Sequence, residues 1–234
     1  MNTIKEKDFI ELDYTGTVKE EHIIFDTTDE KVAKEQDIYN KEMTYGPVIV
    51  CVGQRQVIKG LDTQLIGKQI GTYTIDVSSD DAFGKKNSKL LRLVPMKVFT
   101  QQQIHPHPGL QINMDGVIGT IRSVSGGRIY VDFNHPLAGK ELSYAITIKR
   151  IVGDEKEKLD AFLKMQFGQM EYTLDVKEHL AIVTLPFTLP EEAQQELEKK
   201  AKELIDSLSG LSFPKPAEPE QKKEQTLVEE KSNS

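Results

Sequence analysis

Apolar and polar residues alternate along much of the first 85 residues, a pattern typical of half-buried strands. In residues 8–18 one set of alternate positions carries Ile10, Leu12 and Tyr14, which predicts a strand with one apolar face. Residues 22–28 predict the returning strand of a hairpin, and residues 72–77 another half-buried strand. The pattern therefore favours an antiparallel sheet.

Residues 48–71 are central to this sheet because they contain its most continuous apolar stretch. Residues 48–52 predict a buried strand, Gly53 marks a turn, and a short helix is expected from Leu61 to about Gly67. An earlier short helix is expected at 29–36, where acidic residues lie near the positive end of the helix dipole.

The middle of the chain has a different pattern. Residues 109–133 predict three strands joined by Asp115-Gly116 and Gly126-Gly127 turns, a small β-meander. Residues 90–94 are apolar, and residues 95–103 predict one helical turn. These features indicate a small β-rich insert, after which residues 141–152 return as a long alternating strand.

Beyond Gly153 the periodicity changes again. An amphipathic helix at 154–167, strands at 171–176 and 180–185 and a helix at 190–208 predict a compact α+β domain. The end of the chain, residues 213–234, is rich in Pro, Glu and Lys and is expected to be disordered.

Composition excludes several classes of protein. The chain has 234 residues, 38% of them hydrophobic and 29% charged, and no apolar run that would span a bilayer. The charged N-terminal residues do not resemble a signal sequence, so a cytoplasmic protein is expected. The net charge of -7 argues against binding to nucleic acid or to an anionic membrane.

The residues that usually carry chemistry form no recognisable enzyme motif. The single cysteine, Cys51, lies in an apolar strand and is interpreted as a buried thiol rather than a nucleophile. His105 and His107 could chelate a metal, but no Cys or carboxylate cluster accompanies them, so no metal site is predicted. The Gly residues lack phosphate-loop spacing, and no cofactor is expected.

Four landmarks nevertheless occur in a specific order. They are Tyr14, the pair Phe25-Asp26, the VIKGL segment at 57–61 and the AFG segment at 82–84. This set resembles the FKBP-type peptidyl-prolyl isomerases. The resemblance implies an α+β fold in which an antiparallel sheet wraps around a short helix.

The NHPLAG segment at 134–139 resembles the point where SlyD-like FKBPs return from an inserted flap domain. The layout implied is an isomerase domain at 1–85 and 139–152, an insert at 86–138, a C-terminal domain at 153–212 and a tail at 213–234. This layout looks most like the long-type archaeal FKBPs. The C-terminal domain is small enough that docking or homodimerisation through it is plausible.

The resemblance also implies a proline-binding site, called the prolyl site below. Its predicted residues are Tyr14, Phe25, Asp26, Val57, Ile58, Leu61, Phe83 and Tyr144. Asp26 is expected to orient the peptide, although it could simply cap the turn before Thr27. The apolar members could equally be ordinary core residues. Leu61 and Phe83 depart from the family pattern, which often has Trp and Tyr at these positions.

The insert carries more apolar residues than its size requires, and by resemblance it should bind unfolded, proline-containing polypeptides. The predicted binding residues are Leu91, Leu93, Val94, Met96, Phe99, Met114 and Ile118. About half of them could instead fill the insert's own core. The sequence therefore predicts a prolyl isomerase with chaperone activity. The alternatives are a non-enzymatic holdase with a degenerate pocket and, less favoured, a scaffolding protein.

Overall fold

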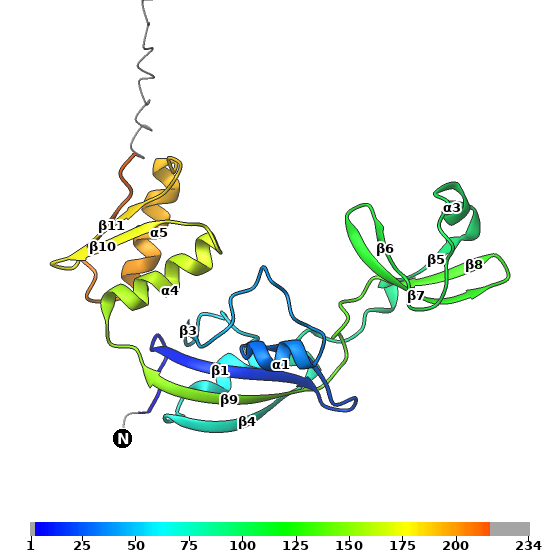
Figure 1. Cartoon of the computed structure of the whole chain (residues 1–234), viewed down its shortest axis with the longest axis horizontal. Coiled ribbons are helices and arrows are strands. Elements are labelled where there is room, and N and C mark those ends of the chain that lie inside the picture. Colours follow the sequence, from blue (N-terminus) through cyan, green and yellow to red (C-terminus); the bar gives the residue numbers. More distant parts are fainter. Residues whose placement is uncertain (1–2, 216–234) are drawn as a thin grey trace, which may run out of the picture. The chain divides into compact units, whose positions relative to one another are not determined.

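The computed structural model describes residues 3–215, which form two compact units divided after Gly153 (Figure 1). Of the tail expected to be disordered, residues 213–215 belong to no regular element, and residues 216–234 lie outside the described part of the chain.

The first unit contains a five-stranded antiparallel sheet. Strand β1 (Phe9–Val18) lies at its centre and pairs with β2 (Ile23–Thr27), β3 (Val48–Cys51) and β9 (Leu142–Ile151). Strand β4 (Gly71–Val77) pairs with the other edge of β9. The predicted strands and their antiparallel arrangement are confirmed, and β9 brings the end of this unit back beside its beginning.

One face of this sheet is covered by a short helix, α2 (Lys59–Leu65). Leu61 and Leu65 of the helix are 1% and 0% exposed and pack with inward-facing strand residues such as Ile146. The helix begins two residues before the expected start at Leu61, because the Ile58 carbonyl already accepts hydrogen bonds from the Leu61 and Asp62 amides. An α+β core is thus formed.

Two other short helices lie in the connections of this sheet. Helix α1 (Glu30–Glu35) follows Asp29, whose side chain accepts hydrogen bonds from the amides of Lys31 and Val32. This is a capped helix start, as expected. A 3₁₀ turn, η1 (Ser79–Asp81), leads from β4 toward Phe83.

The insert forms its own sheet, with strand order β5-β8-β7-β6. Its elements are η2 (Ser88–Leu90), β5 (Leu91–Pro95), α3 (Met96–Gln101), β6 (Gln111–Met114), β7 (Val117–Ser125) and β8 (Arg128–Asp132). The three-stranded meander was an underestimate, because the apolar stretch before α3 pairs with β8 as a fourth strand. Figure 1 shows these strands and α3 gathered together, with two chain segments joining them to the larger sheet.

The second unit is a small α+β arrangement. It contains α4 (Glu155–Phe167), β10 (Thr173–Lys177), β11 (Leu180–Thr184), α5 (Glu191–Leu204) and β12 (Gly210–Ser212).

Helix α5 ends four residues before the predicted end at 208. Ile205 leaves the helical conformation and is 1% exposed, and Leu208 is 5% exposed. The chain then forms β12, a strand not predicted from the sequence, which pairs in parallel with β11. No helix within residues 3–215 is long and apolar enough to cross a membrane.

Candidate functional site

The prolyl site is organised around a cross-strand pair in the centre of the five-stranded sheet. Gly16 of β1 lies directly opposite Tyr144 of β9. A Cβ atom on Gly16 would lie 2.7 Å from Phe25 Cζ and 2.9 Å from Tyr144 Cε1, which is too close for either contact. The absence of a side chain at Gly16 therefore makes room for two aromatic rings on the helix-covered face of the sheet.

A β-bulge brings two consecutive residues of β2 to this site. Ile24 pairs with Thr17 while Asp26 pairs with Gly16, so Phe25 is the extra residue. In a regular strand, Phe25 and Asp26 would point to opposite faces. Here the Phe25 ring lies edge-on to Tyr144, with 5.8 Å between centroids and an interplanar angle of 89°. The Asp26 carboxylate in turn accepts a 2.8 Å hydrogen bond from the Tyr14 hydroxyl.

Helix α2 contributes the residues beneath these rings. Leu61 is buried, and the half-buried Val57 and Ile58 pack against the same core. The loop that precedes them is held by Asp62, which is 4% exposed and accepts 2.8 Å hydrogen bonds from the Gly53 and Arg55 amides. Sequence analysis did not single out Asp62. The signal that could have identified Asp62 is its position directly after the core residue Leu61 and near the turn at Gly53.

Phe83 forms another wall, and its partner was not predicted. The His135 ring stacks on Phe83 with a centroid distance of 4.3 Å and an interplanar angle of 3°. Sequence analysis identified His135 only as part of the NHPLAG segment, and the residue is otherwise exposed. The Gly139 amide also donates a 2.7 Å hydrogen bond to the Gly84 carbonyl, so the two ends of the insert adjoin beside Phe83.

The electrostatics of the site keep its two tyrosines neutral. Burial, together with the charge of Asp26 and the hydrogen bond to it, raises the pKa of Tyr14 well above its usual range. Burial and the nearby Asp26 charge likewise raise the pKa of Tyr144. Both phenols therefore remain protonated hydrogen-bond donors near neutral pH.

All eight predicted prolyl-site residues lie in one region of the first unit. Leu61 and Tyr144 belong to the buried core, and the other apolar members pack against it half-buried. Asp26 joins them through Tyr14. The arrangement combines aromatic and aliphatic walls with one carboxylate and two phenols, and none of these groups is a nucleophile paired with a base. It suits the binding of an apolar group rather than bond cleavage.

The predicted binding residues of the insert separate into two groups. Leu91, Leu93 and Ile118 are exposed, whereas Met96 and Met114 are partly buried against the insert's core.

The prediction was wrong for Val94 and Phe99, which are 6% and 2% exposed and fill that core. Conversely, Tyr130 is exposed and was not singled out. Tyr130 pairs with Leu93 across β5 and β8, and its alternation with buried Ile129 was the signal that could have identified it.

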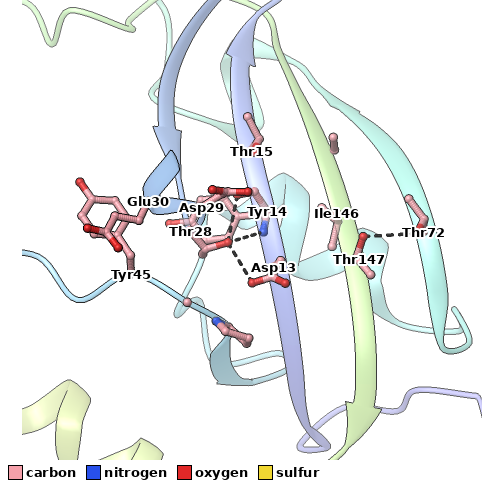
Figure 2. A pocket seen from close by; sticks show the side chains of 13 residues that line it. Asp13, Tyr14, Thr15, Thr28, Asp29, Glu30, Tyr45, Thr72, Ile146 and Thr147 are labelled. Atoms are coloured by element: carbon pink, nitrogen blue, oxygen red, sulfur yellow. Dashed lines mark hydrogen bonds between the residues drawn. The ribbon is translucent and has the colours of Figure 1, made fainter. Parts of the chain in front are cut away.

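A separate hollow of about 590 Å³ lies on the opposite face of the sheet (Figure 2). Its floor includes Asp13, Thr15 and Thr147, which alternate with the inward-facing residues of β1 and β9. Asp13 is already bound by Lys149 at 2.6 Å and by the Thr28 hydroxyl at 3.2 Å. Tyr14 is the one prolyl-site residue in its lining. We assign no ligand to this polar hollow.

The histidines and the cysteine provide no further candidate site among the described residues. Within residues 3–215 no group of three or more His, Cys, Asp or Glu side chains could hold a metal ion. The His107 ring contacts the His105 carbonyl at 3.2 Å, and both residues are exposed. Cys51 is fully buried, and its thiol lies 3.7 Å from the Lys7 carbonyl, as expected for a structural thiol.

Two family models match the first unit, over different residue ranges. Residues 1–100 match the family model described as FKBP-type peptidyl-prolyl cis-trans isomerase. Residues 92–137 match the model described as FKBP26, IF domain, and this range includes most of β5 and all of α3, β6, β7 and β8.

Several curated proteins are similar over this region. The short-type peptidyl-prolyl cis-trans isomerase of Methanocaldococcus jannaschii is 32% identical over 158 residues, covering 67% of this chain and 99% of the relative. The FKBP-type 16 kDa peptidyl-prolyl cis-trans isomerase of Escherichia coli K12 is 32% identical over 111 residues, 45% of this chain and 74% of the relative.

SlyD of Helicobacter pylori is also similar, at 28% identity over 118 residues, 48% of this chain. The match spans 63% of that relative, slightly less than two thirds of its length. Among solved structures, the three FKBP domains of wheat FKBP73 align at 12% identity and a TM-score of 0.34, over 66% of this chain and 42% of that chain.

Proposed function

The chain belongs to the FKBP-type peptidyl-prolyl cis-trans isomerases, and from this premise we propose that its prolyl site catalyses rotation about Xaa-Pro bonds in polypeptides. The observation that carries the proposal is the contact of Tyr14 and Phe25 with the Tyr144 ring, over the same core on which Val57, Ile58 and Phe83 pack. These side chains would enclose the proline ring.

The reaction suits such a site because no covalent bond is broken. Amide resonance opposes rotation with a barrier of about 18–20 kcal/mol, so uncatalysed isomerisation takes tens to hundreds of seconds. In the twisted transition state the imide group loses much of its dipolar character. Apolar walls therefore favour the twisted state over the planar one, and each 1.4 kcal/mol of this preference gives about a tenfold rate increase.

Two polar groups would orient the peptide. Asp26 is held in place by the Tyr14 hydroxyl and would act by orientation, since a tertiary amide has no proton for a carboxylate to remove. The Ile58 amide precedes α2 and donates to none of the described residues, so it is available to a substrate carbonyl.

The assignment is tested with a protease-free isomerisation assay on an Xaa-Pro peptide. The wild-type chain should accelerate isomerisation, and a Tyr14→Ala, Phe83→Ala double variant should not. Equal rates for the two proteins would contradict the proposed site. They would favour a non-enzymatic holdase, in which the insert does all the work.

For the insert we propose a chaperone role: it binds unfolded or partly folded polypeptides and delivers their prolyl bonds to the prolyl site. Exposed Leu91, Leu93 and Tyr130 support this role. Capture by a tethered module raises the effective concentration of the prolyl bond. No membrane or nucleic acid is needed, and we place this activity in the cytoplasm.

Removal of the insert would test this role directly. Lys86 and Gly139 lie side by side, with a Cβ on Gly139 only 3.4 Å from Lys86 Cγ, so residues 87–137 can be replaced by a short bridge. Proline-limited refolding of a protein should slow far more than turnover of a short peptide. Equal losses in both assays would contradict capture by the insert.

For the second unit we propose a homodimer contact in a long-type FKBP layout. Leu180 and Ile182 of β11 are 54% and 47% exposed and point away from the buried Ala181 and Val183. An apolar sheet face of this kind is a candidate for self-association. Sedimentation should show a dimer that an Ile182→Asp variant converts to monomer, and a monomeric wild-type chain would exclude the contact.

A further inference from the structure

The hydroxyl group of Tyr144 has no hydrogen-bond partner among the described residues. Tyr144 is only 4% exposed, and its ring is held between Tyr14 and Phe25. Its hydroxyl forms no hydrogen bond within residues 3–215, and no fully buried side-chain oxygen of these residues is left unpaired. The hydroxyl oxygen is therefore not fully buried, although the side chain as a whole is enclosed, and it lies within reach of the Asp26 charge.

The hydroxyl of Tyr14, the other tyrosine of the site, already has a hydrogen-bond partner. The Tyr14 hydroxyl donates its proton to Asp26 at 2.8 Å. The ring contacts of Tyr144 with Phe25 and Tyr14 would be made equally well by a phenylalanine, so packing does not explain the hydroxyl. A nearly buried polar group without a partner lowers stability unless a ligand or water satisfies it.

The chemistry of the twisted imide provides an acceptor for this donor. In the planar state the proline nitrogen shares its lone pair with the carbonyl and is a poor acceptor. When the bond twists, the lone pair becomes localised on nitrogen. A neutral hydroxyl can then donate to it, whereas a hydrogen bond to the carbonyl oxygen would favour the planar ground state.

We propose that Tyr144 is a catalytic residue: its hydroxyl donates a hydrogen bond to the imide nitrogen of the substrate as the Xaa-Pro bond twists. The inference rests on the proposed prolyl site and adds a polar transition-state contact to its apolar walls. A phenol is protonated at neutral pH, and burial raises the pKa of Tyr144 further, so the donor is present throughout the neutral pH range. The contact forms only in the twisted state, so it should affect kcat rather than KM.

The test is Tyr144→Phe in the full chain, with kcat and KM measured in the protease-free peptide assay. We expect kcat to fall about three- to tenfold, the value of one hydrogen bond, with KM unchanged. The midpoint of thermal unfolding should not fall, because the hydroxyl forms no hydrogen bond with another residue of the range 3–215.

Tyr73→Phe is the matched control. The Tyr73 hydroxyl, on the neighbouring strand β4, donates to the Gln69 carbonyl at 3.0 Å and accepts from the Gln69 amide at 3.2 Å. Its removal should lower the unfolding midpoint and leave kcat unchanged, the reverse of the result for Tyr144→Phe.

Two outcomes overturn the inference. An unchanged kcat in Tyr144→Phe would show that the hydroxyl takes no part in the reaction. A rise in KM alone would show a contact with the planar substrate instead. Both are distinct from failure of the proposed function, in which the wild-type chain itself would match the Tyr14→Ala, Phe83→Ala double variant.

Discussion

The imidazole of His135 lies flat on the Phe83 ring, 4.3 Å away and within 3° of parallel. His135 Nδ1 also accepts a 3.2 Å hydrogen bond from the Leu137 amide, so the proton of the neutral ring is on Nε2. Phe83 belongs to the proposed prolyl site, and His135 lies near the end of the insert. The pair is therefore a physical link between the end of the insert and one wall of the site.

The first prediction concerns this link. His135→Ala removes the stack, worth about 0.5–1.5 kcal/mol, and should lower kcat/KM for a short Xaa-Pro peptide about two- to tenfold. His135→Phe keeps an aromatic ring against Phe83 and should restore activity. His105→Ala, at an exposed histidine within the insert, serves as control. If His135→Ala matched this control, the stack would have no role in positioning Phe83.

A second prediction concerns Gly16. Gly16→Ala places a methyl group within 3 Å of both the Phe25 and Tyr144 rings, and these rings must shift. We expect a loss of about 1–3 kcal/mol in the free energy of unfolding, together with reduced isomerase activity. Gly153→Ala is the matched control, because a Cβ there meets no atom within 4 Å. Urea unfolding and the peptide assay provide the measurements, and normal values for both in Gly16→Ala would refute the crowding argument.

A third prediction concerns the buried carboxylate of Asp62. Asp62→Ala leaves the Gly53 and Arg55 amides without their acceptor. It should lower the free energy of unfolding by about 2–4 kcal/mol. The loop before Val57 should also loosen, which amide hydrogen exchange at Arg55 would detect. Thr63→Ala, which loses only an exposed hydroxyl contact to the Lys59 carbonyl, should have a small effect. Similar losses in the two variants would argue against a special role for Asp62.

A fourth prediction separates client capture from catalysis. Leu91 and Leu93 are 46% and 48% exposed on one face of β5. A Leu91→Ser, Leu93→Ser variant should slow the catalysed, proline-limited refolding of a protein and leave turnover of a short peptide unchanged. Gln111→Ser changes an exposed polar residue of the same insert and is the control. Undiminished refolding activity in the double variant would exclude this face as the client-binding surface.

A fifth prediction concerns pH. Burial by itself would raise the pKa of Asp132, but hydrogen bonds from Asn134 and the Arg122 guanidinium hold that pKa below its ordinary value of 3.8. The carboxylate therefore stabilises the insert above about pH 3.8, and this stabilisation is lost as the pH falls through the lower folded pKa.

Amide hydrogen exchange of Val131 and Ile129, measured at several pH values between about pH 3 and 6, would test this effect. The wild-type chain should lose protection at the acidic end. Asp132→Asn should be less protected at pH 6 and show little further acid loss. The same pH profile in both proteins would mean that other carboxylates govern the acid stability of the insert.

Much of the fold follows from local patterns. Alternation predicted β1, β2, β4 and β9, and the turn glycines predicted the β6-β7 and β7-β8 hairpins, because strand faces and tight turns depend on neighbouring residues. The errors lie where packing overrides local pattern. Val94 and Phe99 were predicted to bind polypeptides at the surface of the insert, but Val94 on β5 and Phe99 on α3 both fill its core.

The sequence by itself determined which residues are proposed for the prolyl site and in which order they occur, since aromatic and β-branched landmarks can be recognised without coordinates. Tertiary structure alone decided how they meet. The bulge that turns both Phe25 and Asp26 inward and the stack of His135 on Phe83 depend on the register of segments far apart in the chain. The Tyr144 hydroxyl was likewise identified as having no partner within residues 3–215 only from the tertiary structure, because hydrogen-bond pairing is a property of the packed molecule.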